Sequence, residues 1–369
     1  MQLPVFQLED YLSRWEFKAP YLLCCSDAES FSMNELLSYA DQVSLNLWNN
    51  LRLSYTEAPG LPILREEIGK LYSGLSESNI LCFAGAEEGI FCALQTLIKS
   101  NDHVITFTPC YQSLESLPQN LGAQVTAISL KEENHWQIDL EEVKKVIQNN
   151  TKAIIINFPH NPTGAVCKED TLKGLIDLAR SQGIYIFSDE VYRLLGNVSI
   201  QPAPIATLYE KGLSLGVMSK AFGLAGLRVG WIACQDIQLL KKIEQTKYYT
   251  SICNSAPSEI LSLIALRAKD TILQRNNLIV KNNLSLIDQF LERYSSLFSW
   301  VRPEGGCVGF MKFYSNISID ELARKLVEKE GVLLMPASIY NYQTNHFRIG
   351  FGRQNMAEAL DKFEHFLKG

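Results

Sequence analysis

Short apolar runs alternate with amphipathic stretches through the middle of the chain. Runs bounded by turn-forming residues cover residues 79–85, 103–109, 123–130, 153–158, 184–189, 213–219 and 227–233. The helical pattern EDTLKGLIDLARSQ (169–182) lies between two of them and ends at Gly183, a residue type that commonly caps helices. Nearly continuous apolar strands separated by helices are typical of a parallel sheet covered on both faces. The pattern therefore predicts an α/β domain with a mostly parallel seven-stranded sheet sandwiched by helices.

The pattern changes after about residue 235. A long helical stretch covers 269–294, and short apolar runs at 305–313, 331–336 and 346–351 indicate strands. These elements predict a second, smaller α+β domain. We expect an N-terminal arm or part of the small domain over 1–44, the large domain over 45–260 and the small domain over 261–369.

Composition narrows the function classes. The 369 residues are 47% hydrophobic and 20% charged with a net charge of −6, and no long basic run occurs, so nucleic acid and anionic membrane are not expected partners. No apolar run is long enough to predict a membrane span. The nine cysteines are scattered without metal-ligand spacing, which predicts no metal site and is typical of reduced thiols in a cytoplasmic protein.

Chemically active side chains follow the predicted strands, where functional residues of open parallel sheets lie. The candidates are Gly85, Ala86 and Glu87 in the turn GAEEG, Tyr111, Asn161 in PHNPTG, Asp189 and Tyr192 in SDEVY, Ser219 and Lys220 in MSKAFG, and Arg228 at the start of the last run. A glycine turn entering a helix can bind an anion, although it can also be an ordinary strand–helix connection. Asp189 needs a cationic partner if it is buried. Lys220 precedes an apolar segment that contains Arg228, an arrangement that can keep its amine nucleophilic.

Together these residues predict a pocket for an anionic, planar, protonatable ring that a lysine can attack. The motifs NPTG, SDEVY and SKAFGLAGLRVGW, in this order, resemble those of the class I/II aminotransferases, pyridoxal 5′-phosphate (PLP) enzymes of fold type I. The similarity covers nearly the whole chain. It implies that Lys220 forms a Schiff base with PLP and then moves protons at the substrate α-carbon, while Asp189 pairs with the pyridine nitrogen.

The resemblance also implies the remaining contacts of the cofactor and the substrate. Asn161 and Tyr192 would bind the ring 3-oxygen, and Tyr111 would stack on the ring. The phosphate would be bound by the turn at Gly85, Ala86 and Glu87 together with Ser219 and Arg228. Arg348 in HFRIGFG would bind the substrate carboxylate. Tyr55 in SYTEAPG would reach the phosphate of a partner subunit, which implies a homodimer with shared active sites. Glu87 and Glu88 depart from the pattern, because acids beside a phosphate would repel it unless they point away.

The sequence motifs constrain the cofactor more closely than they constrain the substrate and the reaction. Residues 248–259 contain no arginine or lysine, which disfavours a dicarboxylate specialist, whereas the N-terminal segment is rich in acids. We expect Glu9 and Asp27 to bind a cationic side chain such as a guanidinium, the alternative being a solvated acidic face.

Transamination is the commonest outcome on this scaffold, but other reactions use the same cofactor residues. The chain is also similar in outline to capreomycidine and enduracididine synthases, in which a hydroxyarginine loses water and the guanidine closes a ring. A non-catalytic PLP-binding regulatory protein is a third alternative, which the lack of a basic helix-turn-helix pattern ahead of the first expected helix disfavours.

Overall fold

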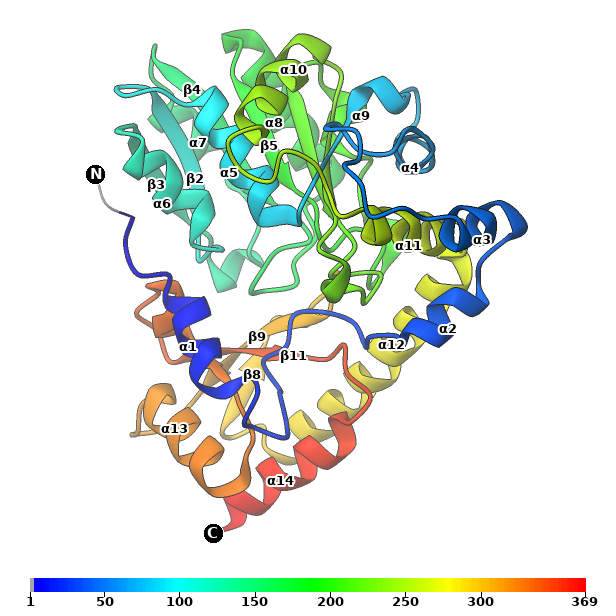
Figure 1. Cartoon of the computed structure of the whole chain (residues 1–369). Coiled ribbons are helices and arrows are strands. Elements are labelled where there is room, and N and C mark those ends of the chain that lie inside the picture. Colours follow the sequence, from blue (N-terminus) through cyan, green and yellow to red (C-terminus); the bar gives the residue numbers. More distant parts are fainter. Residues whose placement is uncertain (1–2) are drawn as a thin grey trace.

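A seven-stranded sheet forms the centre of the larger part of the molecule in the computed structural model, which describes residues 3–369 (Figure 1). The strands are β1 (Ile80–Phe83), β2 (His103–Thr108), β3 (Gln124–Ser129), β4 (Thr151–Asn157), β5 (Tyr185–Asp189), β6 (Gly212–Val217) and β7 (Gly230–Cys234). Their order is β1-β7-β6-β5-β4-β2-β3, and only the two pairings of β7 within this sheet are antiparallel. The predicted mostly parallel sheet is confirmed.

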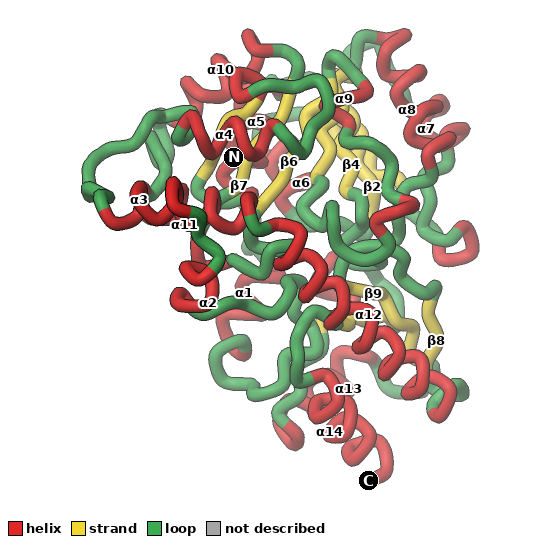
Figure 2. Tube along the Cα trace, turned by 90° about the vertical axis from the view of Figure 1, so that its right-hand side faces the viewer, coloured by secondary structure: helices red, strands yellow, loops and turns green. Residues whose placement is uncertain are grey.

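Helices cover both faces of this sheet, as Figure 2 shows in a view turned by 90°. The helices of this part of the chain are α2 (Met33–Ser38), α3 (Gln42–Asn49), α4 (Pro62–Gly69), α5 (Ala86–Leu97), α6 (Ser113–Asn120), α7 (Leu140–Val146), α8 (Glu169–Gln182), α9 (Ile205–Leu208), α10 (Ile237–Lys247) and α11 (Ala256–Arg267). Of these, α2 and α3 pack on α11 rather than over the sheet (Figure 1). Successive side chains of β4 alternate between the two apolar cores, Ile155 packing in one and Ile154 and Ile156 in the other. Burial on both faces explains why the strands read as unbroken apolar runs.

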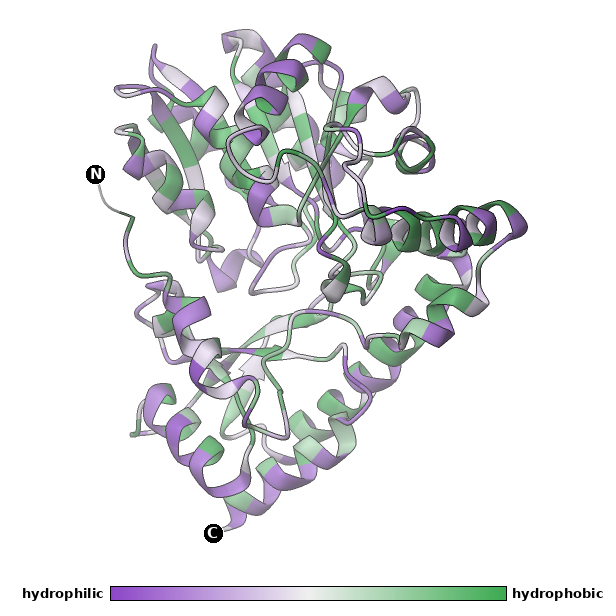
Figure 3. Ribbon diagram, viewed as in Figure 1, coloured by the Kyte–Doolittle hydropathy of each residue, from purple (hydrophilic) through white to green (hydrophobic). Residues whose placement is uncertain are grey.

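The smaller part is built on a four-stranded antiparallel sheet of order β10-β11-β9-β8. Its strands are β8 (Phe298–Trp300), β9 (Val308–Phe313), β10 (Met335–Pro336) and β11 (His346–Gly350), and its helices are α12 (Lys269–Arg293), α13 (Ile319–Glu330) and α14 (Met356–Lys368). Hydrophilic residues lie on the outer sides of α13 and α14 (Figure 3). The predicted smaller α+β unit is confirmed, although β8 was not expected and the run at 331–336 yields a strand of two residues.

Short 3₁₀ helices complete the described elements: η1 (Glu77–Asn79), η2 (Glu132–Asn134), η3 (Val198–Ile200), η4 (Ala225–Leu227) and η5 (Ala337–Tyr340). One of them corrects the sequence analysis. Arg228 does not begin a strand, because it follows η4 with a left-handed φ of 52° and β7 starts at Gly230. This turn directs the residue towards the carboxyl ends of the strands. Within residues 3–369, no helix has the length and apolar character needed to cross a membrane.

The N-terminal segment contains a helix that the sequence analysis did not expect. Helix α1 (Gln7–Trp15) lies between the two parts of the molecule (Figure 1). Its Leu8 and Leu12 pack against Leu333 and Met335 of the smaller part. On the other side, Gln112 of the larger part accepts from the Gln7 backbone N–H at 2.9 Å. The segment therefore bridges both parts at the edge of the cleft between them.

Candidate active site

A cavity of about 410 Å³ lies at the carboxyl ends of β4, β5 and β6, beside the start of α5. Its walls carry nearly all the predicted residues: Glu9, Asp27, Ala86, Glu87, Tyr111, Asn161, Asp189, Tyr192, Ser219, Lys220, Arg228 and Arg348. These positions are separated by more than 300 residues of chain. Asn161, Asp189 and Lys220 meet because the parallel strands that precede them end at one edge of the sheet, whereas Glu9 comes from α1 and Arg348 from β11. Of the predicted residues, Gly85 lies directly behind the wall and Tyr55 lies elsewhere.

Lys220 follows β6 and reaches into the cavity. Its Nζ donates a hydrogen bond of 2.8 Å to the Ser26 hydroxyl and lies 5.7 Å from the centroid of the Tyr192 ring. The lysine forms no ion pair with a carboxylate in the described part of the chain. Its amine is therefore held by a neutral hydroxyl at the centre of the cavity, where it can reach a ligand.

Asp189 ends β5 and is buried in the cavity floor. One carboxylate oxygen accepts from the Val191 N–H at 3.2 Å, and the strand end is fixed by the Asn157 amide, which donates to the Asp189 carbonyl at 2.9 Å. Burial raises the pKa of the Asp189 carboxyl to about 7, an effect opposed by the Val191 hydrogen bond and by Lys220. A cation bound in the cavity beside it would restore the charged form.

Asn161 and Arg348 form one buried cluster with Tyr340. The Asn161 Oδ1 accepts from Arg348 Nη1 at 3.1 Å and from the Tyr340 hydroxyl at 3.0 Å. Arg348 also donates through Nε and Nη2 to the Cys24 carbonyl, at 3.1 and 2.6 Å. Because the amide oxygen of Asn161 is occupied by two donors, its NH₂ group is the end left for a ligand.

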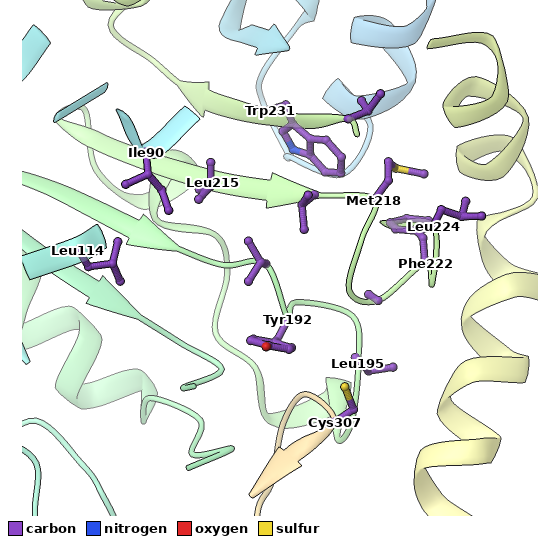
Figure 4. Packing of buried hydrophobic residues seen from close by; sticks show 14 of the residues in the cluster. Ile90, Leu114, Tyr192, Leu195, Leu215, Met218, Phe222, Leu224, Trp231 and Cys307 are labelled. Atoms are coloured by element: carbon purple, nitrogen blue, oxygen red, sulfur yellow. The ribbon is translucent and has the colours of Figure 1, made fainter. Parts of the chain in front are cut away.

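The Tyr192 hydroxyl is buried and makes no hydrogen bond of normal geometry within residues 3–369. Its ring packs in the apolar cluster near Leu195 and Cys307 (Figure 4). Burial raises the pKa of Tyr192 above its ordinary value, while Arg348 and nearby Ser26 oppose the rise. An unpaired buried hydroxyl is costly unless a ligand pairs with it, so it fits the oxygen substituent of a bound ring.

The start of α5 provides an anion-binding turn. Gly85 has a φ of 96°, and a Cβ at this position would lie 2.5 Å from Arg228 Nη2, so the guanidinium packs where only glycine leaves room. The first backbone N–H groups of a helix are free donors, and a guanidinium binds phosphate oxygens in a bidentate manner. With Ser219 on the same wall, this turn fits the phosphate group of PLP.

The two acids of the turn behave differently. Glu88 points away from the cavity and accepts from the Ser251 N–H at 2.9 Å and from Thr250. Burial disfavours its charge, but these hydrogen bonds and one from Ala84 outweigh burial and lower the pKa of Glu88. Glu87 stays on the wall, where Ser113 donates to one oxygen and the other is buried without a partner among the described residues.

Burial also raises the pKa of the Glu87 carboxyl, which favours its neutral form. The repulsion of a phosphate that the sequence predicts is therefore reduced at both positions, by the direction of Glu88 and by the environment of Glu87.

Acids from the N-terminal segment line the mouth of the cavity. Glu9 accepts from the Tyr111 hydroxyl at 3.3 Å, and Glu16 lies on the same wall. Neither carboxylate forms an ion pair in the part of the chain that the structure describes. Asp27 differs, because Arg353 Nη2 contacts both of its oxygens at 2.9 and 3.1 Å. The two predicted acids are thus brought to one cavity, but only Glu9 carries an uncompensated charge.

Tyr55 is 87% exposed in the loop between α3 and α4 and does not line this cavity. Ser26, Tyr340, Glu16 and the carbonyl of Cys24 also contribute to this site, although they were not among the predicted residues. No motif marks these positions, since a serine, a tyrosine and a backbone carbonyl contribute here only through the tertiary contacts of distant segments.

The chain belongs to the class I and II aminotransferase family, whose model, described as aminotransferase class I and II, matches residues 32–363. A PLP-dependent aminotransferase from Streptococcus suis 89-1591 has a solved structure that is 32% identical, with a TM-score of 0.94, and the match covers 100% of this chain and 98% of that one.

Two curated relatives are more distant in sequence. Capreomycidine synthase of Streptomyces vinaceus is 27% identical over 95% of this chain and 90% of that protein. The arginine–pyruvate transaminase of Pseudomonas aeruginosa is 24% identical over 83% and 80%. The predicted family, fold and enzyme class are confirmed: the protein is a PLP-dependent enzyme of the aminotransferase family, whose members typically act on amino acids as dimers.

Proposed function

We propose that the protein is an aminotransferase that carries PLP on Lys220 and acts on an α-amino acid with a cationic, arginine-like side chain. The observation that carries this proposal is the distribution of charge around one cavity. A guanidinium, Arg348, lies in the inner wall, and the unpaired acids Glu9 and Glu16 lie at the mouth. An α-amino acid with a positively charged side chain matches this distribution, because its carboxylate can face Arg348 while its side chain faces Glu9 and Glu16.

The cofactor roles are supported by the contacts around the cavity. Lys220 offers the amine, Asp189 the acid for the pyridine nitrogen, and Asn161 and Tyr192 offer an NH₂ and a hydroxyl for the ring oxygen. Tyr111 faces the cavity as the stacking aromatic, and Gly85, Ala86, Glu87, Ser219 and Arg228 form the phosphate-binding wall. PLP supplies an electron sink when bound, and the protein residues orient the substrate and move its α-proton.

The preference for a cationic substrate rests on Glu9 and Glu16, with Asp27 as a third acid whose charge Arg353 partly offsets. Two unit charges about 4 Å apart attract by roughly 1 kcal/mol even in water-like surroundings and by more where the site is partly dry. The similarity to an arginine–pyruvate transaminase supports the same substrate class.

Elimination followed by ring closure on a hydroxyarginine is the second candidate. The similarity to capreomycidine synthase over 95% of the chain favours it, and the proposed cofactor and guanidinium contacts serve both reactions. The two candidates differ in whether a keto acid is consumed.

We further propose that the enzyme is a homodimer in which Tyr55 reaches the phosphate of the partner's cofactor. The exposed loop residues Leu53 and Tyr55 (88% and 87% exposed) and the exposed Tyr249 (93%) support an interface between copies of this chain, because large exposed apolar side chains gather at contact surfaces.

Mass spectrometry of reaction products tests the function. PLP-loaded protein is incubated with arginine, hydroxyarginines and uncharged amino acids, each with and without a keto acid. Products that require the keto acid and carry a new carbonyl group support transamination, and arginine as the best donor supports the cationic site. A product equal to substrate minus water without a keto acid supports cyclisation. Lys220→Ala is the negative control, and Lys241→Ala on the exposed side of α10 is the matched control.

A further inference from the structure

One short segment, residues 23–29, contacts two of the three cationic side chains of the proposed site, Lys220 and Arg348; we call it the strap. The Cys24 carbonyl accepts from Arg348, and the Ser26 hydroxyl accepts from Lys220 Nζ at 2.8 Å. The strap lies far from both partners in sequence, since Lys220 follows Ser26 by 194 residues. It therefore joins the residue proposed to bind the substrate carboxylate to the residue proposed to carry the chemistry.

The backbone of the strap is fixed on both sides. The Gly350 N–H donates to the Leu23 carbonyl at 2.6 Å, the Ala28 N–H to the Lys220 carbonyl at 3.2 Å, and the Glu29 N–H to the Gly352 carbonyl at 2.8 Å. Packing is so close that a Cβ on Gly350 would lie 1.7 Å from the Cys25 carbonyl oxygen. The backbone that carries Ser26 is thus held by β11 and by the loop of Lys220, which places the Ser26 side chain beside the lysine amine.

We propose that Ser26 is a positioning residue that holds the Lys220 amine in the orientation from which it takes the α-proton of the substrate. The inference rests on the proposed role of Lys220. When the amine takes the α-proton it becomes an ammonium group, and the electron pair of the broken C–H bond is left on the substrate–cofactor system. The Ser26 oxygen accepts an N–H of that ammonium and stabilises its charge.

The hydroxyl can also direct its own proton. Because the Ser26 oxygen accepts from Lys220, its O–H is free to be donated, and the nearby Tyr192 hydroxyl is buried without a well-formed partner. Ser26 therefore lies between the amine that moves the proton and the phenol proposed to bind the ring oxygen. Donation of this O–H towards Tyr192 would leave a lone pair of the Ser26 oxygen facing Lys220.

The test compares Ser26→Ala with Ser26→Thr, which keeps the hydroxyl, and with Ser30→Ala, a change at the exposed serine that directly follows the strap. The single-turnover rate with the best amino acid donor is measured with α-protium and α-deuterium. We expect Ser26→Ala to slow this rate roughly 10-fold with a larger isotope effect and little change in KM, because a hydrogen bond to a charged group is lost. Ser26→Thr restores most of the rate, and Ser30→Ala behaves as wild type.

A second readout does not depend on turnover. The absorbance of PLP bound to the holoenzyme is titrated with pH, and in Ser26→Ala the midpoint shifts to lower pH because the protonated nitrogen of Lys220 loses an acceptor. An unchanged midpoint, or a slower rate with an unchanged isotope effect, overturns the role of Ser26 while leaving the proposed function intact. A wild-type spectrum without a Lys220-dependent band overturns the proposed function itself and this role with it.

Discussion

The Tyr340 hydroxyl donates to the same Asn161 oxygen that Arg348 contacts, at 3.0 Å, and it also accepts from Arg348 Nη1 at 2.6 Å. These two hydrogen bonds of the Tyr340 hydroxyl have two consequences. The amide of Asn161 can adopt only the orientation that leaves its NH₂ group towards the cavity, and the guanidinium of Arg348 is held in one plane. Tyr340 therefore aligns the proposed contacts of both the ring oxygen and the substrate carboxylate.

Replacing Tyr340 by phenylalanine keeps the ring and removes this alignment. Hydrogen bonds to charged groups contribute roughly 1.5–3 kcal/mol, so we expect kcat/KM for the best donor to fall roughly 10-fold or more, with most of the change in KM. Steady-state kinetics of Tyr340→Phe measure this. Tyr342→Phe is the matched control, because the Tyr342 hydroxyl makes only a long contact of 3.5 Å with the Leu130 carbonyl. Equal kinetics for Tyr340→Phe and wild type would contradict the role.

Sequence patterns predict the helices and strands around the site better than they predict the contacts that support its residues. Lys220, Asp189 and Asn161 follow parallel strands, so local motifs and the rule that such strands end together place them in one cavity. Tyr340 and Ser26 have no such signal, because their roles arise from segments that meet only in the folded chain. Arg228 illustrates the limit of periodicity, since its left-handed turn interrupts an apolar run that otherwise reads as one strand.

Charge at the cavity mouth should determine substrate choice. In Glu9→Gln and Glu16→Gln we expect KM for arginine to rise roughly 5-fold for each lost charge, because about 1 kcal/mol of attraction is removed, while KM for an uncharged donor of similar length stays unchanged. Steady-state kinetics with paired charged and uncharged donors measure the difference. Asp10→Asn on the same helix is the control, because Asp10 pairs with Arg14 and does not line the cavity.

A parallel increase in KM for both donors would indicate a general loss of packing at α1 and would contradict charge recognition. The double variant of Glu9 and Glu16 sharpens the test, since two screened charges at one mouth should reduce the preference for arginine further than either single change does.

Asp189 should make the stability of the cofactor-free protein depend on pH. Burial raises its pKa from 3.8 to about 7 on folding, so between these values the folded chain holds a proton that the unfolded chain has released. The free energy of unfolding contributed by this group therefore falls as the pH rises from about 4 to about 7. Asp189→Asn lacks this titration, so the Tm of the variant minus that of wild type should increase over the same range.

Differential scanning calorimetry across this pH range measures the difference. Glu259, whose pKa burial also raises to about 7, is common to both proteins and cancels in the comparison. Asp177→Asn on the exposed side of α8 should track wild type at every pH. A constant Tm difference between Asp189→Asn and wild type would show that the carboxyl does not titrate in this range.

The exposure of Tyr55 leads to a prediction about mixed dimers. If Tyr55 serves the partner's site, a Lys220→Ala chain and a Tyr55→Ala chain that are each weakly active should form a hybrid with one complete site. That site combines Lys220 of the second chain with Tyr55 of the first. We expect activity after mixing and subunit exchange to exceed the sum of the separate proteins, approaching half of the wild-type activity for each hybrid dimer.

A control mixture separates complementation from simple dilution. It combines Lys220→Ala with Tyr314→Ala, a change at a half-exposed tyrosine on the smaller part. The Tyr314→Ala chain keeps both its own Lys220 and its own Tyr55. Its mixture should give only the activity that its own fraction supplies. Additive activity in the Tyr55→Ala mixture, with hybrid formation verified by native mass spectrometry, would mean that Tyr55 acts within its own subunit or not at all. Complementation instead would establish that the active site is assembled from two chains.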